Sequence, residues 1–391
     1  MLKAENIICF SSMEWSSFKT SKVYLMEIFS RTNRVLYVES LGSRTPNLSR
    51  PHLGRIARRI RRWLQGPKRP AGLPKECNIL VYSPVIIPVY HWRWIRRINF
   101  YILRLGLRRL IRRLKLNNPI LWFYLPTAAD LIGELNEKFC LYHCVDDFST
   151  YPGTRSRMFR QLEDKLFTRA NAVFLSNRLL WEKRKALNKN SYYLAHAVRF
   201  KDYQQEFSKA KPLPADIAGL KRPIVAMIGE VAGWIDWGFL TYAARAHPDW
   251  SMVILGPIAY DARLPQAQAV SNIYLLGPKP YCRLPDYYRA IDVCVVSFRL
   301  NEHVKYCTPT RFYEHLAAGK PVVSTDFPAA REFPEQFVKR AKTKEEFARL
   351  IKQSIDEDNT EMALGRKQLA RENTWGHRAE YISEIISSMI K

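Results

Sequence analysis

The sequence lacks the features that mark membrane-spanning, exported and disulfide-bonded proteins. No stretch reaches the roughly 18 consecutive apolar residues of a transmembrane helix, and Met1–Glu5 offers no apolar signal region. The seven cysteines are odd in number and form no Cys-x-x-Cys pair. This usage is typical of reduced thiols and does not favour a structural zinc site. We therefore expect a cytoplasmic protein that binds no metal.

Acidic residues are scarce beside basic ones: 36 Asp or Glu face 62 Lys or Arg, which gives a formal charge of +26 over 391 residues. Residues 51–115 alone hold 17 Lys or Arg and one acid. Within this window, residues 95–116 predict an amphipathic helix. The basic residues that we expect to face a membrane from it are Arg97, Arg104, Arg108 and Arg112.

A second basic segment precedes this helix, and it carries Arg55, Arg58 and Arg59 near Trp63. Two such segments together predict a surface that lies on anionic lipid, whereas one alone would fit a solvated basic face. Nucleic acid is the other polyanion that this charge could attract. Because the chain shows no helix-turn-helix, RNP or zinc-finger pattern, we expect no nucleic-acid partner.

Strand-like and helical segments alternate from the start of the chain. Asn6–Phe10 predicts a strand, residues 19–31 a helix and Arg34–Glu39 a second strand. Further strands are predicted at 78–82, 84–89, 119–124, 139–145, 170–177, 223–228, 250–257, 272–277 and 291–298. The alternation and the length predict two α/β domains. No Gly-x-Gly-x-x-Gly follows the first strand, which disfavours a dinucleotide-dependent oxidoreductase.

Two adjacent carboxylates, Asp146 and Asp147, follow the predicted strand at 139–145. Ligands of open α/β sheets bind beyond the carboxyl ends of the strands, so a substrate hydroxyl would reach this position. Each carboxylate would raise the pKa of the other. Either is a candidate general base, and at least one of them is expected to cap the following helix.

The most informative stretch is residues 305–325, which predicts loop, helix, turn and strand in succession. Thr308 is placed to cap the helix, Pro309 to occupy its first position and Gly319 to end it. Arg311 and Glu314 lie on the helix. Free N–H groups at a helix start suit a diphosphate, and a carboxylate further along accepts hydrogen bonds from ribose or sugar hydroxyls. Taken alone, a capped helix is more often ordinary architecture.

The stretch matches the pattern Ser/Thr-Pro-x-Lys/Arg-x-x-Glu-x-x-Ala-x-Gly-x-Pro-Val-Val at Thr308, Pro309, Arg311, Glu314, Ala317, Gly319, Pro321, Val322 and Val323. It resembles the donor-site helix of the GT-B glycosyltransferases of group 1, or family 4. In addition, Tyr142–Asp147 resembles the Tyr-x-x-x-Asp-Asp segment of bacterial polysaccharide glycosyltransferases of the teichuronic-acid type.

This resemblance implies the GT-B fold, in which two Rossmann-like domains face a central cleft. Residues 1–207 would form an acceptor-binding domain, 208–221 a linker and 222–374 a nucleotide-sugar-binding domain. Residues 375–391 would form a helix that crosses back to the first domain.

The implied activity is transfer of a sugar from a nucleotide-sugar, expected to be a UDP-sugar, to a lipid-linked or membrane-proximal saccharide acceptor. It would serve cell-surface polysaccharide synthesis at the inner face of the cell membrane, without cofactor or metal. The residues expected at the donor are Gly229, Glu230, Tyr281, Arg299, Lys305, Tyr306, Thr308, Pro309, Thr310, Arg311 and Glu314. Asp146 or Asp147 would activate the acceptor.

The chain departs from the family at one position. Many retaining members carry a glutamate eight residues before the one matched by Glu314, and here that position is Tyr306. Inversion is therefore favoured over retention. Two other functions remain open at this point: a GT-B nucleotide-sugar epimerase, and a non-enzymatic basic protein that binds membranes or nucleic acid.

Overall fold

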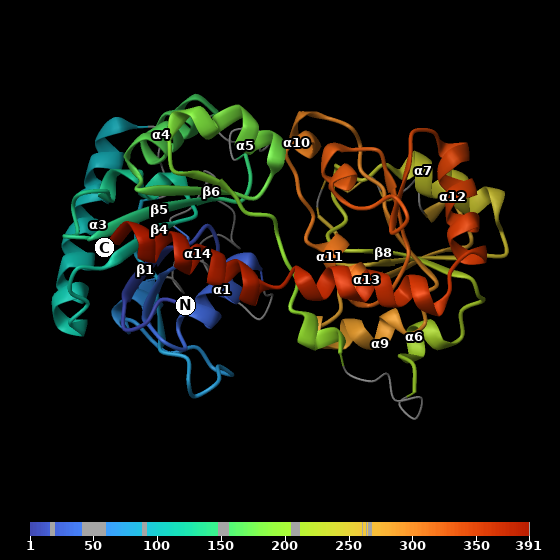
Figure 1. Ribbon diagram of the computed structural model, residues 1–391, viewed down its shortest axis with the longest axis horizontal. Helices are drawn as coiled ribbons and strands as arrows, with labels where there is room; N and C mark the ends of the chain where they lie inside the picture. The colour runs from blue at the N-terminus through green and yellow to red at the C-terminus, as the bar shows by residue number, and fades with distance from the viewer. Residues whose placement is uncertain are drawn as a thin grey trace. The chain divides into compact units, whose positions relative to one another are not determined.

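The structure is a computed structural model that describes residues 1–15, 20–40, 60–87, 92–147, 156–204, 212–259, 261–262, 264 and 268–390. The chain forms two compact units, Met1–Ala195 with Gly376–Lys391, and His196–Trp375. In Figure 1 the first unit runs from blue to green and includes the red helix α14 (Trp375–Ile390), and the second runs from yellow-green to red. The division at Ala195 precedes the boundary expected at residue 207. The described part of the expected linker belongs to the second unit and contains α6 (Ala215–Ala218).

The first unit is built on a seven-stranded parallel sheet with strand order β3-β2-β1-β4-β5-β6-β7. The strands are β1 (Asn6–Phe10), β2 (Arg34–Val38), β3 (Ile79–Tyr82), β4 (Ile120–Phe123), β5 (Phe139–Cys144), β6 (Ala172–Leu175) and β7 (Ser191–Tyr193). Strands β4, β5 and β6 are buried along their whole length. Helices therefore cover both faces of the sheet, which explains why these strands read as continuous apolar runs.

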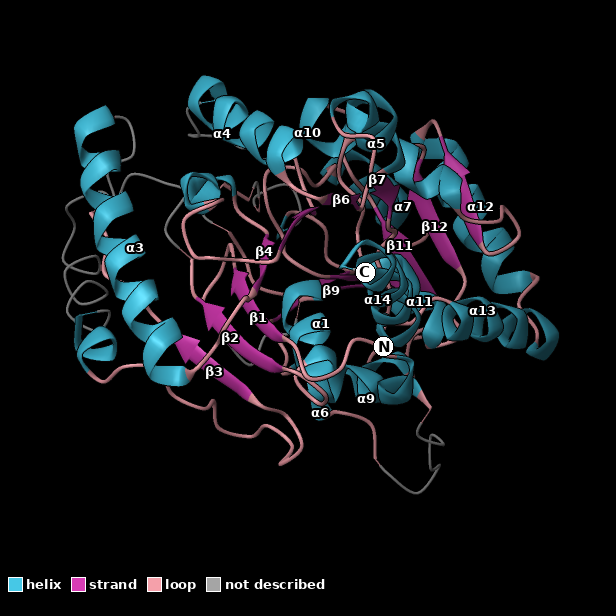
Figure 2. Cartoon of the chain, turned by 60° about the vertical axis from the view of Figure 1, so that its left-hand side comes forward, coloured by secondary structure: helices cyan, strands magenta, loops and turns pink. Residues whose placement is uncertain are grey.

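The helices of the first unit are α1 (Ser21–Phe29), α3 (Arg93–Leu114), η1 (Pro126–Leu131), α4 (Ser156–Arg169), α5 (Arg178–Arg184), η3 (Lys185–Leu187) and α14. Figures 1 and 2 show α1 and α3 on opposite sides of strands β1 to β3. Residues 60–64 are also helical. The basic residues Arg55, Arg58 and Arg59, expected at the membrane, lie outside the described residues.

The strand predicted at 84–89 is wrong for its described part, since residues 84–87 belong to no strand. A side chain from α3 supplies the partners that a neighbouring strand would have supplied. The amide of Asn99 accepts the Ile87 N–H at 2.8 Å and donates to the Ile87 carbonyl at 2.7 Å. The backbone there is satisfied without a sheet.

The second unit contains a six-stranded parallel sheet with order β10-β9-β8-β11-β12-β13. Its strands are β8 (Ile224–Ile228), β9 (Ser251–Leu255), β10 (Ile273–Gly277), β11 (Val293–Val296), β12 (Val322–Thr325) and β13 (Val338–Ala341). Its helices are η4 (Phe200–Tyr203), α6, α7 (Trp237–Ala246), η5 (Tyr281–Arg283), α9 (Leu284–Tyr288), α10 (Glu302–Lys305), α11 (Arg311–Ala317), η6 (Pro328–Glu332), α12 (Lys344–Asp356) and α13 (Thr360–Glu372). In Figure 1, α7 and α12 lie on one side of β8 and α13, α9 and α6 on the other.

Helix α11 starts later than its sequence predicts. Its first residue is Arg311 and its N-cap is Thr310, whose side chain makes no capping hydrogen bond. The prediction that Thr308 caps the helix with Pro309 at its first position is therefore wrong, and both residues lie buried in the segment that joins α10 to α11. The predicted stop is confirmed, because Gly319 follows the helix in the left-handed region at φ +74°.

Both sheets are doubly wound, and each reverses its direction of winding at one point. The reversal lies between β1 and β4 in the first unit and between β8 and β11 in the second. Loops that leave neighbouring strands on either side of such a point diverge and leave room for a ligand at the carboxyl edge. Functional side chains are therefore expected at these two edges.

In the part of the chain that the structure describes, no helix combines the length and the apolarity that crossing a bilayer requires.

Candidate functional site

The centre of the site in the second unit is the contact between Arg311 and Gly229. Gly229 directly follows β8, and its backbone φ is +133°, a conformation that residues other than glycine rarely adopt. A Cβ at this position would fall inside 3.0 Å of the Arg311 guanidinium. A Cβ added at Gly256, which follows β9, would likewise fall inside 3.0 Å of the Gly229 carbonyl oxygen. Gly229 therefore lets the guanidinium lie directly against the backbone at the end of β8, and Gly256 lets the ends of β8 and β9 approach each other.

The Arg311 guanidinium is incompletely hydrogen-bonded. Its Nη1 atom is buried and has no hydrogen-bond partner among the described residues, and its Cζ lies 5.7 Å from the ring centre of Phe298, just after β11. Burial lowers the pKa of Arg311, while the charges of Glu314 and Glu230 act in the opposite direction. Buried donors are almost always paired in folded proteins. A donor left unpaired at the β8–β11 edge is the chemistry expected of an anion site.

Glu314 lies one helical turn from Arg311 and belongs to the same cluster. The Tyr281 hydroxyl donates to Glu314 Oε1 at 3.2 Å, and the hydroxyls of Tyr281 and Tyr203 are 3.5 Å apart. Burial raises the pKa of Glu314, whereas the Arg311 charge and the Tyr281 hydrogen bond lower it. The cluster thus offers a cation and a carboxylate side by side, together with phenol hydroxyls.

A buried histidine lies beneath this cluster on α11. His315 is fully buried and its Nδ1 lies 2.8 Å from the Tyr288 hydroxyl. Burial and the Arg311 charge lower the pKa of His315 to about 3, so the ring is neutral near pH 7. A neutral ring adds no second positive charge beneath Arg311.

The other charged residues expected at the donor have different surroundings. Arg299 donates its Nε–H to the Ile235 carbonyl at 3.1 Å. Lys305 is exposed, with its Nζ 3.9 Å from Glu302 and 5.6 Å from the ring centre of Tyr306. Glu230 is exposed directly after Gly229. Of the predicted cations, Arg311 is therefore the one that the structure brings against Gly229 and Glu314.

Asp146 and Asp147 follow β5 at the carboxyl edge of the first sheet, as the sequence predicts. Lys22, near the start of α1, is buried beside this edge. Burial lowers the pKa of Lys22, and the Asp146 charge opposes that shift. Asp147 is buried and acts on Glu163 of α4. The two carboxylates thus have different surroundings, one facing a cation and the other a second carboxyl group.

Glu163 was not expected from the sequence, because no local pattern distinguishes it from a solvent-facing helix residue. It accepts a hydrogen bond from the Tyr142 hydroxyl at 2.8 Å and lies 3.5 Å from Arg184. Burial raises its pKa to about 7, although the Arg184 charge and the Tyr142 hydrogen bond act against this. Glu163 therefore titrates near neutral pH.

The four arginines predicted on the membrane face of α3 do not share one environment. Arg104 Nε lies 2.6 Å from Glu134 Oε2, and Arg108 Nε donates to the Glu134 carbonyl at 2.8 Å. Arg97 and Arg112 are exposed. The loop after η1 brings the Glu134 carboxylate to two of the four residues, and a membrane role for all four stays a prediction.

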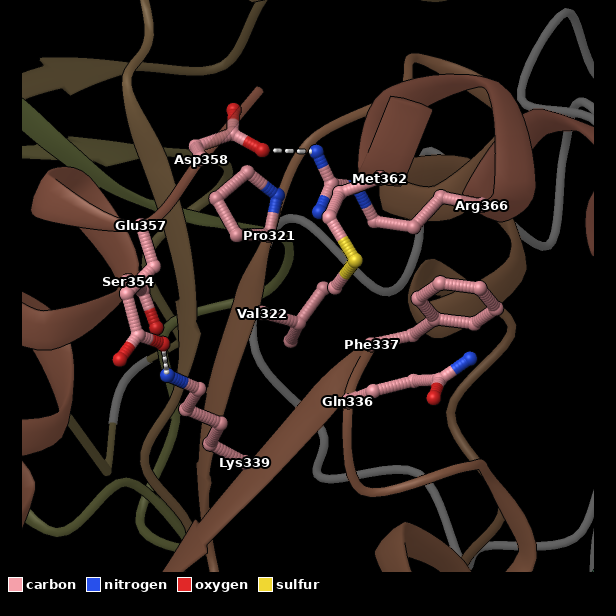
Figure 3. A pocket seen from close by; sticks show the side chains of 10 residues that line it. All are labelled: Pro321, Val322, Gln336, Phe337, Lys339, Ser354, Glu357, Asp358, Met362 and Arg366. Atoms are coloured by element: carbon pink, nitrogen blue, oxygen red, sulfur yellow. Dashed lines mark hydrogen bonds and ion pairs between the residues drawn. The ribbon is translucent and has the colours of Figure 1, made fainter. Parts of the chain in front are cut away.

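The cavity drawn in Figure 3 is too small for a substrate, since its volume of about 20 Å³ admits roughly one water. Arg366 of α13 lines this cavity and is 1% exposed. Arg366 donates to the Gly319 carbonyl at 2.9 Å and pairs with Asp358. Arg366 therefore anchors the end of the helix that carries Arg311. The described residues include no group of three or more His, Cys, Asp or Glu side chains that could hold a metal.

The two doubly wound units have the GT-B fold. Residues 238–384 match the family model described as "Glycosyl transferase-like". Among curated proteins, the chain is similar to TuaH of Bacillus subtilis, whose name assigns it to teichuronic acid biosynthesis as a glycosyltransferase. The two are 23% identical over 230 residues, which cover 56% of this chain. The chain spans 58% of the length of TuaH.

Solved structures share the fold over nearly the whole chain. HepE of Anabaena, crystallised in complex with UDP, superposes with a TM-score of 0.66 at 13% identity, covering 99% of this chain and 100% of HepE. Sucrose-phosphate synthase of Thermosynechococcus elongatus gives a TM-score of 0.70 at 13% identity, covering 98% and 99%. At such identities the likeness establishes the GT-B fold.

Proposed function

We propose that the protein transfers a sugar from a UDP-sugar to a lipid-linked or membrane-proximal saccharide in cell-surface polysaccharide synthesis. The observation that carries the proposal is the buried Nη1 of Arg311 beside Gly229 at the β8–β11 edge, which has no hydrogen-bond partner within the described part of the chain. The HepE crystal structure, of the same fold, contains UDP, and the name of TuaH assigns it to teichuronic acid biosynthesis. Both support this choice of donor and product.

In this proposal Arg311 neutralises the diphosphate that leaves when the bond to the anomeric carbon breaks. A guanidinium fixed against the backbone needs little reorganisation as that charge develops. Glu314, held by Tyr281, accepts hydrogen bonds from hydroxyls of the ribose or of the transferred sugar. Arg299 and Lys305 add positive potential without a metal ion.

Asp146 or Asp147 takes the proton from the attacking acceptor hydroxyl. Lys22 favours Asp146 for this role, since a nearby cation keeps a carboxylate ionised and able to act as a base. Attack by an activated hydroxyl in a single displacement inverts the anomeric centre. NMR of the product distinguishes this outcome from retention.

Membrane association is supported by an apolar stripe on α3 rather than by arginines alone. Trp94 is 58% exposed, Tyr101 54% and Leu105 58%. Arg97 and Arg112 are exposed on the same helix. Large apolar side chains beside cations suit the interface of an anionic bilayer, where the apolar groups enter the acyl boundary and the cations meet headgroups.

The exposed apolar surface continues beyond α3. Trp63 and Leu64 are exposed in the short helix at 60–64. The Trp63 side chain forms a hydrogen bond with Tyr82. The Tyr82 hydroxyl in turn lies close to Gly106 of α3, 3.4 Å from the position that a Cβ there would take. The short helix and the middle of α3 therefore adjoin the same residue, and we propose that both contact the inner face of the cell membrane.

The donor assignment is tested by thermal stabilisation with UDP-, GDP- and dTDP-sugars, followed by UDP titration of Arg311→Met. Loss of one charge-assisted hydrogen bond, about 1.5–3 kcal/mol, should weaken UDP binding about 10- to 150-fold. Arg331→Met is the matched control, because Arg331 is 61% exposed and pairs with Asp326 at the surface. If Arg311→Met binds UDP with the affinity of the wild type, Arg311 does not bind the diphosphate.

The rival functions give different results in the same assays. An epimerase would convert the donor without any acceptor. A non-enzymatic binding protein would gain no stability from any nucleotide-sugar.

The membrane assignment is tested by co-sedimentation with vesicles that contain phosphatidylglycerol. Leu105→Ser should lower the vesicle partition coefficient about 10- to 150-fold, because burial of a leucine side chain contributes about 1.5–3 kcal/mol. Leu364→Ser is the control, since Leu364 of α13 is 61% exposed in the other unit. Equal losses in both variants would argue against a dedicated surface on α3.

A further inference from the structure

A cavity in the first unit lies at the carboxyl edge of the sheet, away from Asp146. Its volume is about 230 Å³, and the side chains that matter for its chemistry are Trp15, Glu39, Arg62, Lys68, Arg69 and Ser83. Glu39 and Ser83 directly follow β2 and β3, and Trp15 lies in the loop after β1. This is the edge at which open α/β sheets bind ligands.

The chain builds the wall of this cavity by folding residues 60–70 back over the sheet. Lys68 forms an antiparallel bridge with Val81 of β3, with hydrogen bonds of 3.0 and 2.8 Å between their backbones. That bridge fixes Lys68 and Arg69 at the rim. The short helix before it places Arg62 above Glu39, 3.5 Å from Glu39 Oε2.

The floor of the cavity is a buried carboxylate whose position is fixed. Glu39 is 3% exposed. It accepts hydrogen bonds from the backbone N–H of Trp15 at 2.9 Å and from the Ser83 hydroxyl. Glu39 therefore fixes the Trp15 backbone, and the Trp15 ring is oriented by its edge-on packing against Tyr37 at 4.9 Å. A fixed carboxylate, a hydroxyl and an indole in one small cavity suit a sugar ring, whose faces are apolar and whose edges carry hydroxyls.

The charges around the cavity favour an anionic ligand, since three lining cations face one lining carboxylate. The cations are not equally available. Arg69 donates to the carbonyls of Pro74 and Cys77, and Arg62 also pairs with Glu14 at 3.1 Å. Lys68 Nζ contacts Gln65 Oε1 at 2.9 Å. An ammonium has three donors, so Lys68 retains the greatest capacity to bind an anion.

The size limits the ligand to one ring with a small substituent, because pockets for drug-sized molecules start at about 300 Å³. Three strand spacings separate β2 from β5. At about 4.8 Å each, the cavity lies about 14 Å from Asp146 along the edge. A ligand group held here would be remote from a hydroxyl that reacts at Asp146.

We propose that this cavity binds a monosaccharide unit that carries a phosphate or carboxylate, with Lys68 on the anion and Trp15 on the ring. Identifying that unit as a part of the acceptor rests on the proposed function. The binding of the anionic sugar does not, and it can be measured without any transfer.

The experiment titrates the full-length protein with glucose 1-phosphate, glucuronate, glucose and inorganic phosphate, with ligand-observed NMR as the readout. The phosphate and carboxylate sugars show which anion the cavity takes. Lys68→Met should weaken the preferred anionic sugar about fivefold, as expected for one partly exposed charge pair, and Trp15→Ala should weaken it by a similar factor. UDP affinity should not change in either variant.

Arg61→Met is the matched control, because Arg61 is exposed on the same short helix and does not line the cavity. Equal effects of Arg61→Met and Lys68→Met would mean diffuse electrostatics and would overturn the proposal. It would also be overturned if no anionic sugar binds, or if inorganic phosphate binds as well as glucose 1-phosphate and Trp15→Ala has no effect. Failure of UDP binding would instead refute the donor site and leave this result standing.

Discussion

Gly229→Ala is the sharpest test of the donor site, because the structure predicts that it acts through another residue. The added methyl group would fall inside 3.0 Å of the Arg311 guanidinium, at a backbone φ of +133°. The guanidinium must therefore move. The backbone strain should lower the free energy of unfolding by about 1–3 kcal/mol. Loss of the guanidinium from its position should weaken UDP binding about 10- to 150-fold.

A double-mutant cycle separates these two effects. In an Arg311→Ala background the methyl group meets no guanidinium, so Gly229→Ala should still reduce stability but should cause little further loss of UDP affinity. UDP titration and urea unfolding of the four proteins measure both quantities. Gly219→Ala is the control, since no atom lies within 4 Å of its added methyl group and its φ is −90°. Additive losses of UDP affinity from Gly229→Ala and Arg311→Ala would refute the reasoning.

Two further predictions concern stability. The pKa of Glu163 is about 7 in the folded chain against an ordinary 4.5, so the folded state holds the extra proton and stability falls as pH rises from about 4.5 through 7. Glu163→Gln should abolish this fall in the free energy of unfolding, which is on the order of 3 kcal/mol. Urea unfolding across that pH range measures it, and parallel pH profiles of the wild type and the variant would contradict the prediction. Arg366→Met should destabilise the second unit by about 1–3 kcal/mol, because it removes a buried donor and leaves the Gly319 carbonyl unpaired, whereas Asp358 is exposed and can be solvated. Lys339→Met is the control, because Lys339 pairs with the exposed Glu357, and it should change the free energy of unfolding by less than about 1 kcal/mol. Similar losses in the two variants would argue against the anchoring role of Arg366.

The strands were predictable because their signal is local and strong. Runs such as 139–145 and 223–228 are apolar on both faces, which is typical of strands buried between two helix layers. Gly319 was predictable for a similar reason, since ending a helix in the left-handed region favours glycine. The pattern around Arg311 and Glu314 also indicated the correct class of fold.

The errors arose where distant side chains replaced a local preference. Asn99 satisfies the backbone of Ile87 and removes the need for a strand. The sequence also did not indicate that Glu134 pairs with two arginines of α3. Neither contact follows from the periodicity of the helix.

The sequence by itself determined the alternation of strands and helices, the two-domain organisation and the positions of the charged and apolar segments, because these depend on residues within a few positions of one another. The tertiary structure decided which side chains meet. Arg311 lies against Gly229, Tyr281 donates to Glu314, and Glu39 and Trp15 enclose a cavity with Lys68. Such contacts depend on strand order and on the approach of backbones at glycine. Both are set by packing of the whole unit rather than by local propensity.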